Sequence, residues 1–177
     1  MKNFEEIKKY EDLNNISKKG GAVFFGGSYL STIPICELVR DWGLDMPVHN
    51  RSIKGLTIDE AQNALNTCIF SLKPQKVFLN IGDCDILNKT KTDDFIAKYE
   101  WLLYTLHINC KCRIYVLSVV STSPRTNEIN SRLKQLCETH KCEFIDMNEL
   151  NEPRKFFDKI RFYMRSYPIT FSEAMSV

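Results

Sequence analysis

The sequence predicts one α/β domain over residues 1–177, a three-layer α/β/α sandwich with about five parallel strands. Short apolar segments of strand length alternate with segments of helical periodicity along the whole chain. The apolar segments are almost unbroken, which is typical of a parallel sheet that is covered on both faces. A length of 177 residues, 44% of them hydrophobic, allows one buried core and leaves little room for a second domain.

The elements follow from periodicity and from helix-start signals, taken in chain order. We expect an N-terminal helical extension over residues 1–20, with its helix at Asn3–Ile16. The expected strands are Ala22–Phe25, Met46–Ile53, Lys76–Ile81, Arg113–Val120 and Cys142–Met147. We expect a helix from Ser28 to about Trp42 and another through Phe70, which a capping box at Thr57–Glu60 opens. Two further helices are indicated by apolar residues at steps of three and four, Ile96-Tyr99-Leu103-Leu106 and Ile129-Leu133-Leu136. A C-terminal helix within 150–177 starts at Pro153.

Charge and hydropathy exclude several classes of protein. The 24 basic and 22 acidic residues leave a net charge of +2, which gives no electrostatic case for binding nucleic acid or an acidic membrane. No apolar segment approaches the roughly 20 residues that span a bilayer, and the charged N-terminus lacks the apolar segment of a secretory signal. Seven cysteines without an export signal indicate reduced thiols. We therefore expect a cytoplasmic protein without membrane or nucleic-acid partners.

Chemistry-bearing residues gather where the predicted strands end, the edge at which such sheets bind ligands. Gly26 and Gly27 permit a tight turn from the first strand into a helix, and Ser28 follows them. Free backbone N–H groups at a helix start favour negative charge, so this turn suits a nucleophilic hydroxyl or a bound anion. Glycines that merely serve turns are the alternative explanation.

The order of these loop motifs resembles that of the SGNH (GDSL-like) hydrolase family. FGGS (25–28) matches the family's strand and Gly-Asp-Ser turn, NRSIKG (50–55) its Asn-Arg-Gly-x-x-Gly block, and NIGDCD (80–85) its Gly-x-Asn-Asp block. The resemblance covers about residues 20–150, including a similar fourth strand, helix and fifth strand. It implies a flavodoxin-like SGNH-hydrolase fold, with Ser28 as the nucleophile. Gly55 and the Ser28 N–H group would form the oxyanion hole.

Three departures from the family pattern affect catalysis. Gly27 stands where the family has Asp, and Cys84 stands where it has the oxyanion-hole Asn, although a thiol is a poor donor. The C-terminal Asp-x-x-His that supplies the family's base has no counterpart. By position, Arg165 and Pro168 would replace that Asp and His. Losing both a base and an oxyanion donor predicts impaired or absent ester hydrolysis.

A serine nucleophile needs a base within hydrogen-bond reach, and several residues are candidates for this role. The topology places His107 and His140 at the opposite edge and His49 in or before the second strand. Lys54 adjoins Gly55 and is a candidate base if burial lowers its pKa. Asp83 and Asp85 are further candidates, with ordering of the neighbouring loop as the alternative role for Asp85.

Two other clusters have simple structural explanations. Cys110, Cys112, Cys137, His140 and Cys142 share the opposite edge, and four such ligands would suit zinc. Their spacing is not that of a recognised zinc motif, so we expect free thiols and no metal or cofactor. Basic and aromatic residues alternate within 153–167, a pattern that can bind single-stranded nucleic acid, but their spacing favours an amphipathic helix that covers the sheet.

Two hypotheses of function result. The first is a serine esterase or deacylase that acts through Ser28 on small acyl or acetyl esters, including esters of carbohydrates. The second is a non-catalytic SGNH-fold protein that binds an anionic or carbohydrate ligand at the Gly26-Gly27-Ser28 turn. Arg51, Lys54 or Arg125 would assist that binding. The missing histidine favours the second hypothesis, and the family resemblance favours the first.

Overall fold

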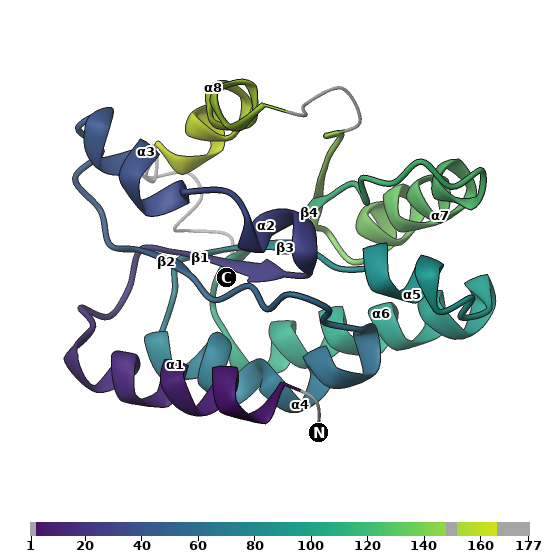
Figure 1. Ribbon diagram of the computed structural model, residues 1–177, viewed down its shortest axis with the longest axis horizontal. Helices are drawn as coiled ribbons and strands as arrows, with labels where there is room; N and C mark the ends of the chain where they lie inside the picture. The colour runs from purple at the N-terminus through teal and green to yellow at the C-terminus, as the bar shows by residue number, and fades with distance from the viewer. Residues whose placement is uncertain (1–2, 148–151, 166–177) are drawn as a thin grey trace, which may run out of the picture.

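The computed structural model describes residues 3–147 and 152–165, which form a five-stranded parallel sheet flanked by helices (Figure 1). The strand order is β2-β1-β3-β4-β5, and every neighbouring pair is parallel. The strands are β1 (Ala22–Gly26), β2 (Val48–Asn50), β3 (Lys76–Asn80), β4 (Arg113–Leu117) and β5 (Glu143–Ile145). The predicted α/β/α sandwich with five parallel strands is confirmed.

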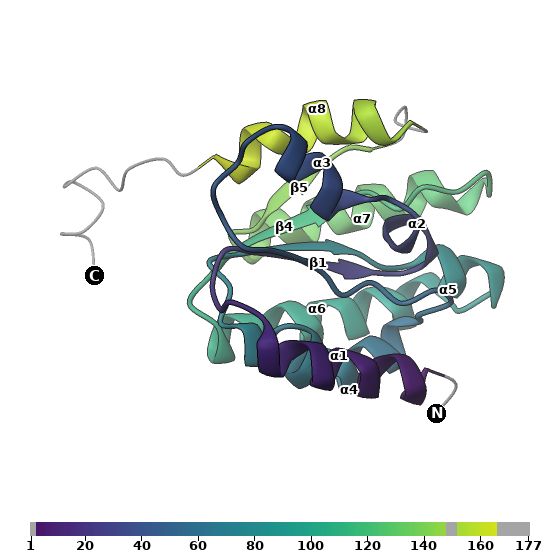
Figure 2. The ribbon, with the colours of Figure 1, turned by 60° about the vertical axis from the view of Figure 1, so that its left-hand side comes forward.

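Helices cover both faces of the sheet, with α1, α4 and α6 on one face and α3 and α8 on the other (Figure 2). The helices are α1 (Phe4–Ile16), α2 (Ser28–Ser31), α3 (Ile35–Asp41), α4 (Ile58–Cys68), α5 (Asp83–Leu87), α6 (Thr92–Asn109), α7 (Arg125–Thr139) and α8 (Pro153–Met164). A 3-10 turn, η1 (Phe70–Leu72), follows α4. The remainder of the expected C-terminal segment, residues 166–177, lies outside the described residues.

Two hydrophobic clusters fill the spaces between the layers. Alternate residues of each strand point to opposite faces, so Val23 joins the cluster under α1, α4, α6 and α7 while Phe24 joins the cluster under α2, α3 and α8. Phe24, Phe78 and Tyr115 stack across β1, β3 and β4, with ring centroids 4.5 and 4.7 Å apart. All residues of β1 and β3 are buried, as unbroken apolar strands predict.

The element boundaries differ from the expectations mainly in the first half of the chain. The helix expected from Ser28 to about Trp42 is two helices, α2 and α3, because Pro34 lacks the N–H group that would continue the first. The second strand is shorter than expected, and α5 was not expected. The capping box of α4 is confirmed, since the side chains of Thr57 and Glu60 each accept a backbone N–H group of the other residue.

Helix α8 runs back across the sheet from the edge at which the strands end. Near its start, the ring of Phe156 packs edge-on against Tyr29, 6.1 Å away between centroids. At its end, the Lys76 ammonium at the beginning of β3 donates to the carbonyl oxygens of Tyr163 and Arg165 at 2.7 and 2.8 Å. Phe156 and Ile160 are buried, so this segment is the sheet-covering amphipathic helix expected. No helix among the described residues is long and apolar enough to cross a membrane.

Candidate functional site

Ser28 lies at the first position of α2, directly after the tight turn that ends β1. The N–H group of Gly27 donates to the carbonyl oxygen of Asn80 on β3 at 2.9 Å. A Cβ atom on Gly26 would lie only 2.1 Å from the same oxygen. The close approach of β1 and β3 therefore requires glycine at position 26 and fixes where the serine begins.

The three sequence blocks converge on the Ser28 hydroxyl. The backbone N–H of Gly55 donates to Ser28 Oγ at 3.2 Å, and Cys84 Sγ lies 3.7 Å from the same oxygen. Gly55 adopts a φ of +84°, a conformation that favours glycine, and this turn aims its N–H group at the serine. The structure thus brings together Ser28, Gly55 and Cys84 from loops that are far apart in sequence.

Asp83 holds the backbone beside the serine. Its Oδ2 atom accepts the N–H of Ser28 at 2.9 Å, and its Oδ1 atom accepts the N–H of Cys84 at 2.9 Å. A Cβ atom on Gly27 would lie 2.3 Å from Asp83 Oδ1, so this carboxylate occupies the space that a side chain at position 27 would need. The sequence suggested only the role of a base for Asp83. The contact of Asp83 with Ser28 could have been suspected from the sequence, because the third block carries an acidic residue while position 27 lacks the acid of the family pattern.

These contacts engage the groups that would stabilise an oxyanion. The Ser28 N–H group is bound to a carboxylate, and the Gly55 N–H group is bound to the serine hydroxyl itself. The third position is a thiol, and burial raises the pKa of Cys84. A tetrahedral oxyanion beside Ser28 would have to compete with the negative charge of Asp83 for the Ser28 N–H group.

No histidine lies beside Ser28, although all three of the chain's histidines are in the described residues. His49 Nε2 is 3.0 Å from the carbonyl oxygen of Lys18, and burial lowers the pKa of this imidazole. His107 Nε2 is 2.8 Å from the carbonyl oxygen of His140, and both residues lie near the amino ends of β4 and β5. None of the hydrogen bonds of these three imidazoles, in the part of the chain that the structure describes, is made to Ser28.

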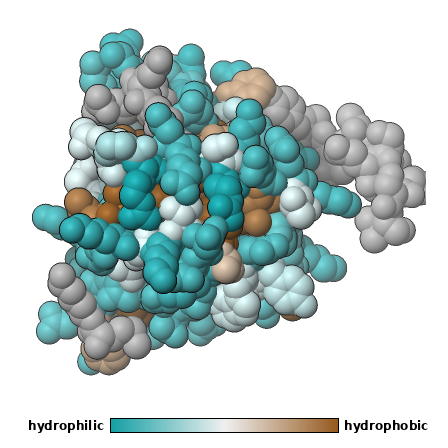
Figure 3. Space-filling view, turned by 90° about the vertical axis from the view of Figure 1, so that its right-hand side faces the viewer, coloured by the Kyte–Doolittle hydropathy of each residue, from teal (hydrophilic) through white to brown (hydrophobic). Residues whose placement is uncertain are grey.

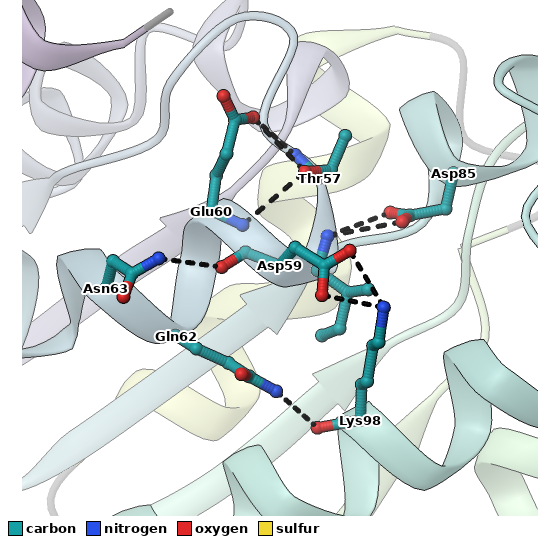
Figure 4. A network of polar contacts seen from close by, with 8 residues as sticks. Thr57, Asp59, Glu60, Gln62, Asn63, Asp85 and Lys98 are labelled. Atoms are coloured by element: carbon teal, nitrogen blue, oxygen red, sulfur yellow. Dashed lines mark hydrogen bonds and ion pairs between the residues drawn. The ribbon is translucent and has the colours of Figure 1, made fainter. Parts of the chain in front are cut away.

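The other candidate bases are also oriented elsewhere. Lys54 is exposed, and in the described part of the chain no hydrogen bond joins it to Ser28. Asp85 is buried, and its carboxylate accepts the N–H of Ile58 at 3.1 and 3.3 Å at the start of α4 (Figure 4). Burial raises the pKa of Asp85 to about 6. This carboxylate therefore stabilises the start of α4, the helix that follows the Gly55 loop.

The side chains of the two arginines that were candidates for anion binding form hydrogen bonds within the protein. Arg51 is buried, and its guanidinium donates to Asn14 Oδ1 on α1 at 3.0 and 3.1 Å. Arg125 at the start of α7 donates to the carbonyl oxygen of Thr90 and, at 3.3 Å, to Thr92 Oγ1. Both side chains therefore contact neighbouring helices or loops of the protein.

Two asparagines position the site and were not singled out in the sequence. Asn50 Nδ2 donates to the carbonyl oxygen of Leu30 at 2.9 Å, which ties the second loop to the end of α2. Asn80 Nδ2 donates to the carbonyl oxygen of Ser118 at 2.8 Å, which ties the end of β3 to the end of β4. Each is an amide at the last position of its strand, Asn80 buried and Asn50 half-buried, and a polar side chain at a covered strand end was the available signal.

The C-terminal comparison by position fails for Arg165. Its carbonyl oxygen is bound to Lys76 at the amino end of β3, whereas Ser28 lies beyond the carboxyl end of β1. Because α8 returns across the sheet, Arg165 cannot stand where the family's Asp would be. Pro168 lies outside the described residues.

The cysteines at the opposite edge form no recognisable metal centre. Cys142 Sγ lies 3.6 Å from His107 Nε2, but within residues 3–147 and 152–165 no three His, Cys, Asp or Glu side chains are arranged to hold a metal ion. All seven cysteines carry free thiols.

A serine after the first strand of a sheet ordered β2-β1-β3-β4-β5, with Gly55 and Cys84 beside it, defines the SGNH-hydrolase fold that the motif order implied. Solved structures have the same fold. A Streptococcus pneumoniae protein proposed to be a platelet activating factor superposes with a TM-score of 0.81 at 18% identity, covering 92% of each chain. A lipase/acylhydrolase from Enterococcus faecalis gives 0.64 at 17% identity, covering 74% of this chain and 77% of that one.

An acetylxylan esterase from Geobacillus stearothermophilus also superposes, with a TM-score of 0.64 at 14% identity over 85% of this chain and 99% of that one. No protein-family model and no curated protein matches the sequence. At such low identities the likeness establishes the SGNH-hydrolase fold, and the activity must be argued from the site.

Proposed function

We propose that this protein binds a neutral, hydroxyl-bearing ligand of the carbohydrate class at the Ser28 edge and that Ser28 is not an efficient nucleophile. The observation that carries the proposal is the hydrogen bond from the Ser28 N–H group to the Asp83 carboxylate at 2.9 Å. It places a negative charge where acyl transfer requires unoccupied donors. The lack of a histidine near Ser28 removes the proton acceptor as well.

The same contact supports one of the two ligand classes that the sequence left open, the carbohydrate. An anion would be repelled by Asp83, and Arg51 and Arg125 are committed to contacts within the fold. Carbohydrate hydroxyls, in contrast, donate readily to a half-buried carboxylate. Seen from the side at which the strands end, the surface is mainly hydrophilic with smaller hydrophobic areas between, which suits a sugar better than a long acyl chain (Figure 3).

Residual esterase or deacylase activity on small acyl or acetyl esters is the second candidate. It is favoured by one observation, the Gly55 N–H group directed at Ser28 Oγ from 3.2 Å, which preserves part of the hydrolase geometry. Lys54, Asp85 or a partner chain would then have to act as the base. Hydrolysis by this route must depend on Ser28.

A fluorophosphonate probe separates the two candidates. We expect no adduct by intact mass on the wild-type protein, beside a reactive control hydrolase that labels fully. An adduct that disappears in Ser28→Ala would show an activated serine and would contradict the proposal. In parallel, we expect neutral xylooligosaccharides to raise the Tm of the wild-type protein and to have less effect on Asp83→Asn than on the control Asp12→Asn, an exposed carboxylate on α1.

A further inference from the structure

Helix α6 carries apolar residues on its solvent side as well as on the side that covers the sheet. Its inner side contributes to the hydrophobic core. On its outer side Trp101, Tyr104 and Ile108 are 50%, 57% and 63% exposed. Together with the exposed Ala97 they form an outer stripe, in which the residues follow at steps of four, three and four. This is the spacing at which one helix packs along another.

Ion pairs within the chain border the outer stripe on both sides. Helix α6 lies between α4 and α7. Toward α4, the Lys98 ammonium is 2.7 Å from Asp59 Oδ1 (Figure 4), and toward α7, Arg132 Nη1 is 3.0 Å from Asp93 Oδ1. Among the described residues, no element packs over the stripe between these two ion pairs. An aromatic centre with a polar rim thus faces solvent, which is the usual composition of a protein interface.

We propose that the outer stripe of α6 is the contact surface of a homodimer, in which α6 of a second copy packs antiparallel on it about a twofold axis. The two copies then use the same surface, so the stripe must fit itself. With the axis between positions 101 and 104, Trp101 lies opposite Tyr104 of the second copy, and the small Ala97 lies opposite the large Ile108. A parallel pair would instead place Trp101 on Trp101 and Ala97 on Ala97, so only the antiparallel pair matches large residues with small ones.

The charges at the two ends of α6 favour the same orientation. The first turn is acidic, and the exposed Asp94 precedes Lys98 by four residues, which places it on the side toward α4. Beyond the other end of α6, the exposed Lys73 and Lys111 line one cavity with Phe70, which follows α4 in η1. The twofold axis brings Asp94 level with Lys111 of the second copy, on the same side of the interface. The antiparallel dimer therefore gains two acid–base contacts, whereas a parallel dimer would bring the acidic turns together.

The area of the outer stripe determines how strong the association can be. The three large side chains are at least half exposed, so they present roughly 300 Å² per copy, or roughly 600 Å² in the pair. Stable complexes bury at least about 1,200 Å² in total, and the polar rims on α4 and α7 must supply the remainder. We therefore expect a weak dimer, with monomer predominant at about 1 μM protein and dimer at about 200 μM. The dimer does not depend on the proposed function of the Ser28 edge.

Sedimentation velocity of the full chain over this concentration range tests the inference. We expect the mass to rise with concentration from 20.6 kDa toward twice that value. Trp101→Glu places a charge at the centre of the stripe and should weaken dimerisation at least about tenfold. Phe162→Ser removes an exposed aromatic ring from α8, on the other face of the sheet (Figure 2), and should behave as the wild-type protein. Both side chains are exposed, so circular dichroism should show that both variants fold.

Two results would overturn the dimer. One is a wild-type protein that stays monomeric at the highest concentration, and the other is a folded Trp101→Glu variant that dimerises as well as the wild-type protein. The first is read on the unaltered chain, so it does not depend on how the variants behave.

An exchange of charges tests the antiparallel orientation. Asp94→Lys and Lys111→Asp each make both end contacts repulsive, so each should raise the Kd of the dimer at least about threefold at low salt. The double variant restores both contacts and should return the Kd to within about twofold of the wild-type value. Asp12→Lys, at an exposed position of α1, should leave the Kd unchanged. A double variant that dimerises no better than the single variants would show that the helices are not paired in this way.

Discussion

The Asp83 carboxylate accepts the backbone N–H of Ser28 at 2.9 Å, across two loops separated by 55 positions in sequence. Position 27, between β1 and the serine, carries no side chain, and a Cβ atom there would lie 2.3 Å from Asp83. The acid that the SGNH family carries before its serine is thus replaced in space by an acid from the third block. This exchange keeps the turn anchored but directs negative charge at an oxyanion donor.

Removal of this carboxylate should change which ligands the turn accepts. In Asp83→Ala the Ser28 N–H group loses its internal partner, so we expect acetate or phosphate to raise the Tm of the variant and not that of the wild-type protein. Thermal unfolding with and without each anion measures this. Asp12→Ala removes a carboxylate on α1 and should behave as the wild-type protein. An equal response of all three proteins would show that Asp83 does not control the turn.

Restoring an amide at the oxyanion position should not restore hydrolysis. In a working centre a single oxyanion donor changes the rate by about 10²–10³. In Cys84→Asn we expect the hydrolysis of an activated acetyl ester to stay within about tenfold of the wild-type rate, because no histidine stands beside Ser28. Measurements on Cys84→Asn with Ser28→Ala give the background. A Ser28-dependent gain of a hundredfold would reveal a base and contradict the interpretation.

The strands themselves were predictable because each is an apolar segment of neighbouring residues, whereas their order in the sheet, which joins segments far apart in the chain, was not predicted. β1 and β3 are unbroken apolar segments, and the motif order placed Ser28, Gly55 and Cys84 at one edge. The contact of Asp83 with Ser28 was not predictable, since it depends on the direction of one side chain across two loops. Helix α5 was missed because five residues are too few to show a helical period.

Asp85 should make stability depend on pH in a direction opposite to that of most carboxylates. Burial raises its pKa to about 6 in the folded protein, so the native state binds the proton more tightly than the unfolded state does. The contribution of Asp85 to the free energy of unfolding is therefore most favourable below about pH 4 and is lost as the pH rises through about 6. A shift from 3.8 to about 6 corresponds to about 3 kcal/mol.

Urea unfolding of Asp85→Asn measures this contribution. Relative to the wild-type protein, the variant should gain up to about 3 kcal/mol in the free energy of unfolding between pH 4 and pH 7. The amide oxygen can still accept the N–H of Ile58, so the start of α4 keeps a partner. Asp12→Asn, with an exposed carboxyl, should show no such change. If the free energies of unfolding of Asp85→Asn and the wild-type protein changed with pH in parallel, the raised pKa of Asp85 would be refuted.

Adding a methyl group should lower the free energy of unfolding by different amounts at Gly26 and at Gly43. In Gly26→Ala the new Cβ would lie 2.1 Å from the Asn80 carbonyl oxygen, so β1 and β3 must separate. In Gly43→Ala there is open space, and only the φ of +64° is unfavourable, at about 1 kcal/mol. We expect Gly26→Ala to lower the free energy of unfolding by at least about 2 kcal/mol more than Gly43→Ala does. Equal losses would mean that the strands adjust without cost.

Arg51 shows why the second block has a structural task besides its place near the serine. The buried guanidinium donates twice to Asn14 Oδ1 and lies 5.1 Å from the ring centroid of Tyr10, so α1 supplies a neutral hydrogen-bond acceptor for this cation. Asn14→Leu leaves this cation buried without those acceptors and should cost about 3 kcal/mol in the free energy of unfolding.

The double variant separates this effect from the other contacts of Asn14, whose Nδ2 atom donates to Thr67 and Ser71. In the Arg51→Met background, Asn14→Leu should cost less by about 1.5 kcal/mol, because no buried charge remains to be left unpaired. Urea unfolding of the four proteins in this cycle gives the coupling energy. Asn63→Leu, at an exposed position of α4, should change stability by about 0.5 kcal/mol or less. Strict additivity of the two substitutions would show that Asn14 does not stabilise the folded state through Arg51.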